Sequence, residues 1–143
     1  PFFDRALIID RPQCTSSPTL ADINHVSAVL VYNLGLSNHL MGMNTGSSRS
    51  FKKALTLYRM ASRLLDVDSA FDNLLSLAVF NNMGAIHDHF VDTLERQHCL
   101  EYLQAILEDV EERGEEALNT AYVHFKMNVF SLYGQMDGPA PAA

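Results

Sequence analysis

The sequence has few cysteines and no long hydrophobic stretch. Only two cysteines, Cys14 and Cys99, occur in 143 residues, too few for the disulfide framework of a small secreted domain. Two unpaired thiols are expected, with a single bridge between them as the alternative. No apolar run approaches the ~20 residues that a membrane-spanning helix needs, so no membrane segment is predicted.

Basic residues are also scarce: 10 Lys and Arg stand against 17 Asp and Glu, giving a formal net charge of −7. A surface of that sign repels phosphate backbones, so no nucleic-acid binding is expected, and a basic or neutral protein partner fits better. No Ser/His/Asp order, CxxC pair or GxGxxG motif indicates an enzyme, and the loop 42–50 lacks the Lys of a Walker motif. The sequence therefore predicts a protein without catalysis or cofactor.

The composition is that of a globular protein, with 48% hydrophobic and 19% charged residues. A chain of this length can bury a sizeable core, so residues 1–143 are predicted to form a single domain. The chain starts at Pro1 with neither an initiator Met nor a charged-then-apolar leader. We therefore expect a processed form or an excised piece of the protein, from which any targeting segment has gone. A soluble, intracellular protein is expected, and the residues predict no particular organelle.

Helical periodicity dominates residues 20–113. Thr19 and Asp22 have the spacing of a capping box, which predicts a first helix over about 20–42. The Ser-rich loop 45–50 precedes a second helix, and Asp68 is a fair N-cap for a third over about 69–90. Asp92 then precedes a fourth helix that Gly114 should end. The pattern predicts two antiparallel helical hairpins.

The two ends of the chain have a different pattern. Apolar residues from Val123 to Val129 alternate with polar ones, which is the repeat of a half-buried strand. The other strand-like segment lies at residues 2–9, and an isolated strand cannot satisfy its backbone. We therefore predict that residues 2–9 and 122–132 pair antiparallel, with a fifth helix as the alternative for 116–132. The fold class is mainly α with two short terminal strands, and the tail 137–143 is predicted to be unstructured.

Similar short segments stand at equivalent places in the two hairpins. In the first hairpin, Asn33-Leu34-Gly35 is followed by a second helix with small, aromatic and small residues at Ala54, Tyr58 and Ala61. This arrangement resembles a tetratricopeptide repeat. The resemblance implies that Gly35 and Ala54 let two helices approach closely while Tyr58 fills the space beside them. The second copy, Asn82-Met83-Gly84, precedes Cys99, Leu103 and Ile106.

The spacings depart from that family. Gly35 and Ala54 stand 19 residues apart, which predicts lengthened turns between the helices. Gly35 and Gly84 stand 49 apart, where the family repeat is ~34 residues. The chain is therefore expected to be a divergent tetratricopeptide-like protein. The segment NNMGAIHDHF is also similar to a set of uncharacterised diatom proteins, which implies no activity.

Two asparagines are the leading candidates for a binding site. The resemblance implies that Asn33 and Asn82 face an inner groove and hydrogen-bond the main chain of a bound peptide. The alternative is a hydrogen bond between helices of the scaffold itself. His39 and His89 are added as candidates for partner binding.

A metal site is the rival hypothesis. His39, His87, Asp88 and His89 could converge, because the first and third helices are expected to lie side by side. A neutral imidazole and a carboxylate suit a divalent metal. The pair His87-Asp88 also resembles the HD phosphohydrolases, whose remaining ligands would have to come from His25 or His39 and from Asp109. Against this, His87 and His89 point about 200° apart on one helix. Histidines satisfied by neighbouring backbone groups are the other interpretation.

An acidic run ends the fourth predicted helix. Its members are Glu108, Asp109, Glu111, Glu112, Glu115 and Glu116. Such runs are usually solvated, but acids at a helix C-terminus oppose the macrodipole, which favours a basic partner. Two hairpins are also few for a solenoid, so either the paired terminal strands close them off or a second copy of the chain does, and the second case predicts a homodimer.

The sequence as a whole favours a non-catalytic interaction module or scaffold that binds a peptide or a partner subunit. A small metal-dependent phosphohydrolase and a structural subunit of a larger assembly are the alternatives.

Overall fold

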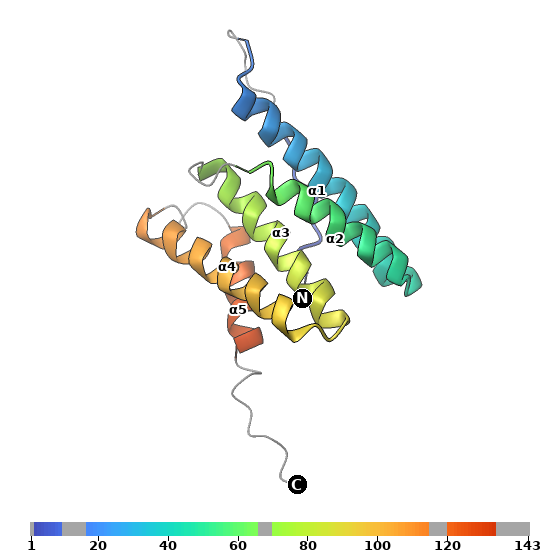
Figure 1. The fold of residues 1–143 in the computed structure, drawn as a ribbon. Coiled ribbons are helices and arrows are strands. Elements are labelled where there is room, and N and C mark those ends of the chain that lie inside the picture. Colours follow the sequence, from blue (N-terminus) through green and yellow to red (C-terminus); the bar gives the residue numbers. More distant parts are fainter. Residues whose placement is uncertain (1, 10–16, 66–69, 115–119, 134–143) are drawn as a thin grey trace.

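A computed structural model describes residues 2–9, 17–65, 70–114 and 120–133. The described residues contain five helices and no strand, arranged as two hairpins and a final helix (Figure 1). The helices are α1 (Leu20–Thr45), α2 (Ser48–Ser62), α3 (Ala70–His89), α4 (Thr93–Glu112) and α5 (Thr120–Tyr133). The predictions for Cys14, for an N-cap at Asp68 and for the tail 137–143 lie outside the described residues.

The capping box predicted at the start of α1 is confirmed. The Thr19 hydroxyl accepts from the backbone N–H of Asp22, and the Asp22 carboxylate accepts from that of Thr19. The helix is a few residues longer than the expected 20–42, because α1 continues to a left-handed Gly46. Gly42 is buried inside the helix, where a Cβ atom would lie 2.8 Å from Cδ1 of Phe51. This glycine is there for the close approach of the Phe51 ring and does not end the helix.

The prediction of lengthened turns is also wrong. The turn from α1 to α2 consists of Gly46 and Ser47, and the one from α3 to α4 of residues 90–92. The additional residues lie in the helices, which are longer than the repeat spacing implies. The two helices of the first hairpin approach closely at Gly35, where a Cβ atom would lie 2.9 Å from the Tyr58 ring.

The turn from α3 to α4 is held by two backbone hydrogen bonds. Val91 N–H donates to the Asp88 carbonyl and Asp92 N–H to the His87 carbonyl, which is the pattern of a Schellman motif. Val91 occupies the left-handed position, with φ 59°, where glycine is usual. Asp92, which the sequence placed just before this helix, then caps α4 by accepting from the Glu95 N–H through its side chain.

Helix α5 replaces the strand predicted at 122–132, and the pairing of the two termini is therefore wrong. Ala121, Tyr122, Phe125 and Val129 are buried, a spacing that belongs to one helical face. Val123 and Met127, which the alternating pattern placed on the same side as Phe125, are each 61% exposed. A short segment that is apolar on several sides fits both the two-residue repeat of a strand and the 3.6-residue repeat of a helix. Packing against α3 and α4 selects the helix.

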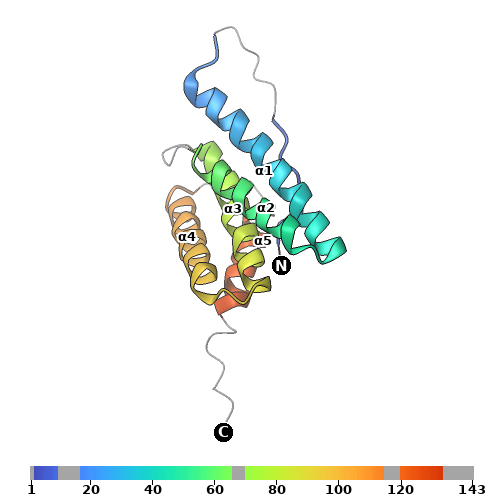
Figure 2. The same cartoon turned by 45° about the vertical axis from the view of Figure 1, so that its right-hand side comes forward.

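Residues 2–9 form neither a helix nor the predicted strand. Figures 1 and 2 show this segment as an elongated stretch that runs beside α1 into the middle of the molecule. Phe3 is 4% exposed and belongs to the hydrophobic core, against which Phe2, Leu7 and Ile9 also pack. The segment is thus an integral part of the fold.

The hairpins stack in chain order. Helix α1 packs mainly on α2 and α3 mainly on α4, while α2 joins the two hairpins through α3 and α5 packs on both α3 and α4 (Figure 2). Stacking of this kind is how repeat proteins bury a continuous core. None of the described helices combines the length and the apolar character needed to cross a membrane.

Candidate functional site

Two asparagine side chains each hold one residue of the N-terminal segment by its main chain. The Asn82 side-chain oxygen accepts from the Phe3 N–H at 2.7 Å, and its NH2 group donates to the Phe3 carbonyl at 2.9 Å. Asn33 does the same for Leu7, at 3.0 and 2.8 Å. We call these two paired contacts the amide clamps.

The clamps occupy equivalent positions in the two hairpins. Asn33 lies on α1 two residues before Gly35, and Asn82 lies on α3 two residues before Gly84. A primary amide carries both a donor and an acceptor, so it can pair with the N–H and C=O of one residue as a neighbouring strand would. The contact reads the main chain and is independent of the side chain at that position.

The N-terminal segment buries Phe3, leaves Phe2, Leu7 and Ile9 partly buried, and exposes its other side chains. The Phe3 ring lies 5.0 Å from that of Phe125 and 5.8 Å from that of His124, both on α5. The Phe2 ring lies 4.6 Å from His39 on α1. The outward positions are exposed: Asp4, Arg5, Ala6 and Ile8. We call the residues that hold the segment the clamp site: Tyr32, Asn33, His39, Asn82, His124 and Phe125.

A buried hydrogen-bond network surrounds the inner clamp. The Asn82 NH2 group also reaches the hydroxyls of Tyr32 and Tyr58, at 3.4 and 3.3 Å. Its neighbour Asn81 accepts from Asn128 on α5 at 2.9 Å. Because these residues come from four helices, the network fixes how both hairpins and α5 meet around Phe3.

The network is electrically neutral. Burial raises the pKa of the Tyr32 and Tyr58 side chains, so both hydroxyls keep their protons. Burial, with a smaller contribution from His89, lowers the pKa of His39 to about 4, so this ring is uncharged at neutral pH. Its Nδ1 lies 3.3 Å from the Tyr58 hydroxyl. A neutral polar lining suits a peptide main chain better than a charged ligand.

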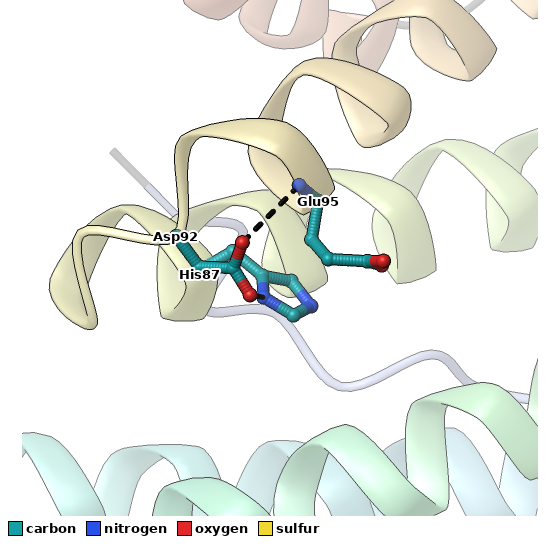
Figure 3. Close-up of polar contacts among 3 residues, drawn as sticks. All are labelled: His87, Asp92 and Glu95. Atoms are coloured by element: carbon teal, nitrogen blue, oxygen red, sulfur yellow. Dashed lines mark hydrogen bonds and ion pairs between the residues drawn. The ribbon is translucent and has the colours of Figure 1, made fainter.

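The proposed HD pair is divided between two different contacts. Nδ1 of His87 lies 3.1 Å from a carboxylate oxygen of Asp92, whose other oxygen accepts from the Glu95 N–H (Figure 3). Asp88 instead pairs with Arg96 at 2.7 Å. Asp92 thus connects the His87 ring to the first turn of α4, which ties the α3–α4 turn together. Within the described part of the chain, Nε2 of His87 is buried without a hydrogen-bond partner.

The other residues of the metal hypothesis also have separate partners. His39 contacts Tyr58 and Phe2, and Asp109 pairs with Arg113. His89 is exposed, and its ring contacts that of Phe51 in a tilted arrangement with centroids 4.5 Å apart. In residues 2–9, 17–65, 70–114 and 120–133, no three His, Cys, Asp or Glu side chains are grouped to hold a metal ion.

The residues expected to pack the repeat divide into two groups. Ala54, Tyr58 and Ala61 are fully buried, and a Cβ atom on Gly84 would be 3.4 Å from that of Cys99. Leu34 is the exception: it is 55% exposed and lines a groove between α1 and α2 with Lys52, Lys53 and others. Its expected place in the core is therefore wrong, because Gly35 and Leu36 take the inward positions.

Cys99 is a free, buried thiol in the structure. Burial raises its pKa to about 12, and the charges of Glu95 and Asp92 act in the same direction. The thiol is therefore protonated at neutral pH and lacks the character of a nucleophile.

The acidic run, as far as it is described, has partners within the chain. Glu111 pairs with Lys126 on α5 at 2.6 Å, and Glu108 accepts from Gln104 at 2.8 Å. With Asp109 bound to Arg113, these contacts account for three of its carboxylates. A basic partner stays a prediction, and the described part of the acidic run adds no support for it.

Comparison of the chain with family models, with curated proteins and with solved structures finds no significant match. The clamp site therefore has to be interpreted from its own geometry. The sequence nominated Asn33, Asn82 and His39, but missed the role of Phe2, Phe3 and Leu7 by assigning them to a strand. The available signal was the aromatic pair Phe2-Phe3 before a second apolar group, in a chain with two equivalent asparagines.

Proposed function

We propose that this chain is a non-catalytic protein-interaction module that binds an extended segment of a polypeptide at the clamp site. The observation that carries the proposal is the pair of amide clamps, each of which takes both hydrogen-bonding groups of one main-chain residue. Residues 2–9 display the mode of binding within the same molecule.

The energetics of a buried amide support this proposal. Asn82 is completely buried, and a buried polar group without a partner costs about 1–3 kcal/mol. Burial of the Asn82 amide therefore avoids this cost only when a main chain occupies the clamp site. The resemblance to tetratricopeptide repeats adds support, because it implies an asparagine at this position that holds a peptide main chain.

The test uses the full-length chain with Leu7→Ala, which weakens the hold of residues 2–9 at a half-buried position. Labelled protein is applied to an array of unrelated eight-residue peptides. We expect a subset of spots to bind, and we expect a further Asn33→Asp substitution to abolish that binding, because a carboxylate cannot donate to the peptide carbonyl.

Asn38→Asp is the matched control. Asn38 lies on the same helix, and its NH2 group donates to the Leu34 carbonyl of α1 itself. Its replacement should leave the array unchanged. Equal binding by the Asn33→Asp variant would place the peptide elsewhere, and a folded Leu7→Ala protein that binds no peptide would disprove the proposed function.

A further inference from the structure

Resting on the proposed function, we infer which peptides the clamp site selects and what controls access to it. The site selects an extended segment of a partner protein with an aromatic residue at the first clamp and an aliphatic residue four positions later. Residues 2–9 carry that pattern themselves and act as an internal competitor for the site.

The spacing of four residues follows from the positions of the clamps. Asn82 holds residue 3 and Asn33 holds residue 7, and both side chains project from packed helices. Four residues of extended chain span roughly 13 Å. A segment that engages both clamps must therefore place its two anchored residues four apart.

The aromatic preference follows from the surroundings of Phe3. Its side chain is buried against Phe125 and His124, at centroid distances of 5.0 and 5.8 Å, within the range in which aromatic rings attract one another. A smaller side chain would leave a cavity in the core. Leu7 is half-buried against the same core, so an aliphatic residue is sufficient at the second position.

The clamp site does not select the residue type at the exposed positions of a bound segment. Asp4, Arg5 and Ala6 are exposed, and Ile8 is 87% exposed. None of these four side chains is held in the core, and His39 within the clamp site is neutral at pH 7. Partner segments are therefore recognised mainly by the apolar side chains at the two clamps and by their main chain.

Covalent attachment makes residues 2–9 a strong competitor. They belong to the same chain as α1, and a short tether gives an internal ligand an effective concentration in the millimolar range. An external peptide must displace this segment before it binds. A substitution that weakens the binding of residues 2–9 should then raise the affinity for an external peptide by the same factor, without any change in the clamp site.

The experiment measures binding of a fluorescent peptide, FFDRALII, to the full-length wild-type chain and to its Leu7→Ala variant by polarisation. We expect at least about tenfold tighter binding to the variant. A peptide with Asp4→Ser, Arg5→Ser and Ile8→Ser should bind equally well, because it changes outward positions alone. A peptide with Phe3→Ala and Leu7→Ala should lose at least about tenfold, because both anchors are truncated.

A second measurement keeps the inference testable if Leu7→Ala disturbs the fold. Hydrogen exchange at the Phe3 and Leu7 amides of the wild-type chain should accelerate when saturating peptide displaces the internal segment. Unchanged exchange with peptide bound, or equal affinity for wild type and variant, would exclude internal competition.

The failure of this inference differs from a failure of the proposed function. Peptides that bind in an Asn33-dependent way but without preference for the two anchors would overturn the selected pattern and leave the interaction module standing. Absence of any bound peptide on the array would remove both.

Discussion

At the scale of single residues, Asn82 is the buried side chain whose hydrogen bonds the fold depends on most. It is completely buried, and its amide meets the main chain of Phe3, two tyrosine hydroxyls and the side chain of Asn81. Such a network is favourable only when every member is satisfied. An isosteric change that removes its donors should therefore be costly.

We predict that Asn82→Asp lowers the free energy of unfolding by about 3 kcal/mol, because it removes every donor of the side chain and buries a carboxylate. Urea denaturation followed by circular dichroism measures the effect. Asn38→Asp on α1 should change it by less than about 0.5 kcal/mol. Similar stability of the two variants would show that the inner clamp contributes little to the fold.

His39 gives a prediction for pH. Its pKa is lowered from 6.5 to about 4, first by burial and then by His89, so between these values the unfolded chain binds a proton that the folded chain does not. Stability should fall as the pH drops below 6.5 and level off near 4. From pH 7 to 5 this single group accounts for a loss of about 2 kcal/mol.

The measurement compares unfolding free energies at pH 7 and pH 5 for the wild type and for His39→Gln. The variant lacks the titrating group, so its decrease should be smaller by the contribution of His39, whatever its absolute stability. Identical slopes would mean that His39 titrates normally in the folded protein. His124, whose pKa is also lowered by burial, contributes in both proteins and cancels in the comparison.

At the scale of elements, the α3–α4 turn contains a strained residue. Val91 has φ 59°, a left-handed conformation that costs a β-branched residue about 1–2 kcal/mol, and its side chain is 80% exposed. The Schellman hydrogen bonds and the contact of Asp92 with His87 hold it there.

We predict that Val91→Gly stabilises the protein by about 0.5–1 kcal/mol, because relief of the strain exceeds the entropy that glycine adds to the unfolded chain. Thermal unfolding checks the sign. Ile23→Gly, at an exposed position inside α1, is the matched control and should destabilise by about 0.5 kcal/mol. A destabilising Val91→Gly would indicate that the valine makes contacts that outweigh its backbone conformation.

How well an element is predicted depends on how local its signals are. The start of α1 follows from Thr19 and Asp22, three residues apart, and both the prediction and the structure begin the helix there. Its end lies at the left-handed Gly46. Gly42 is inside the helix under the Phe51 ring, a contact that residue spacing does not reveal. Helix α5 matched two periods equally well, and its environment selected one of them.

At the scale of the whole molecule, residues 2–9 join parts that are distant in the chain. Phe3 bonds to Asn82 across 79 residues and Leu7 to Asn33 across 26. The two hairpins and α5 therefore share one buried segment, which supplies the closure that the sequence assigned to paired terminal strands.

The homodimer that the sequence predicts stays a prediction, and the structure directs its test to α5. Val123, Met127 and Phe130 form an exposed apolar face on this last described helix, where a solenoid would continue. Light scattering at micromolar concentration should give twice the mass of one chain. Met127→Lys with Phe130→Lys should restore the single mass without loss of helicity, and a monomeric wild type would end the hypothesis.

The sequence by itself determined that the chain is mainly helical, where four of its helices lie and which two asparagines occupy equivalent places. These features depend on the period of apolar residues and on caps within one turn, which are local. Tertiary structure decided the form of both termini and the partners of the asparagines. A side-chain amide can pair with any main chain brought to it, and that choice depends on contacts between segments far apart in the sequence.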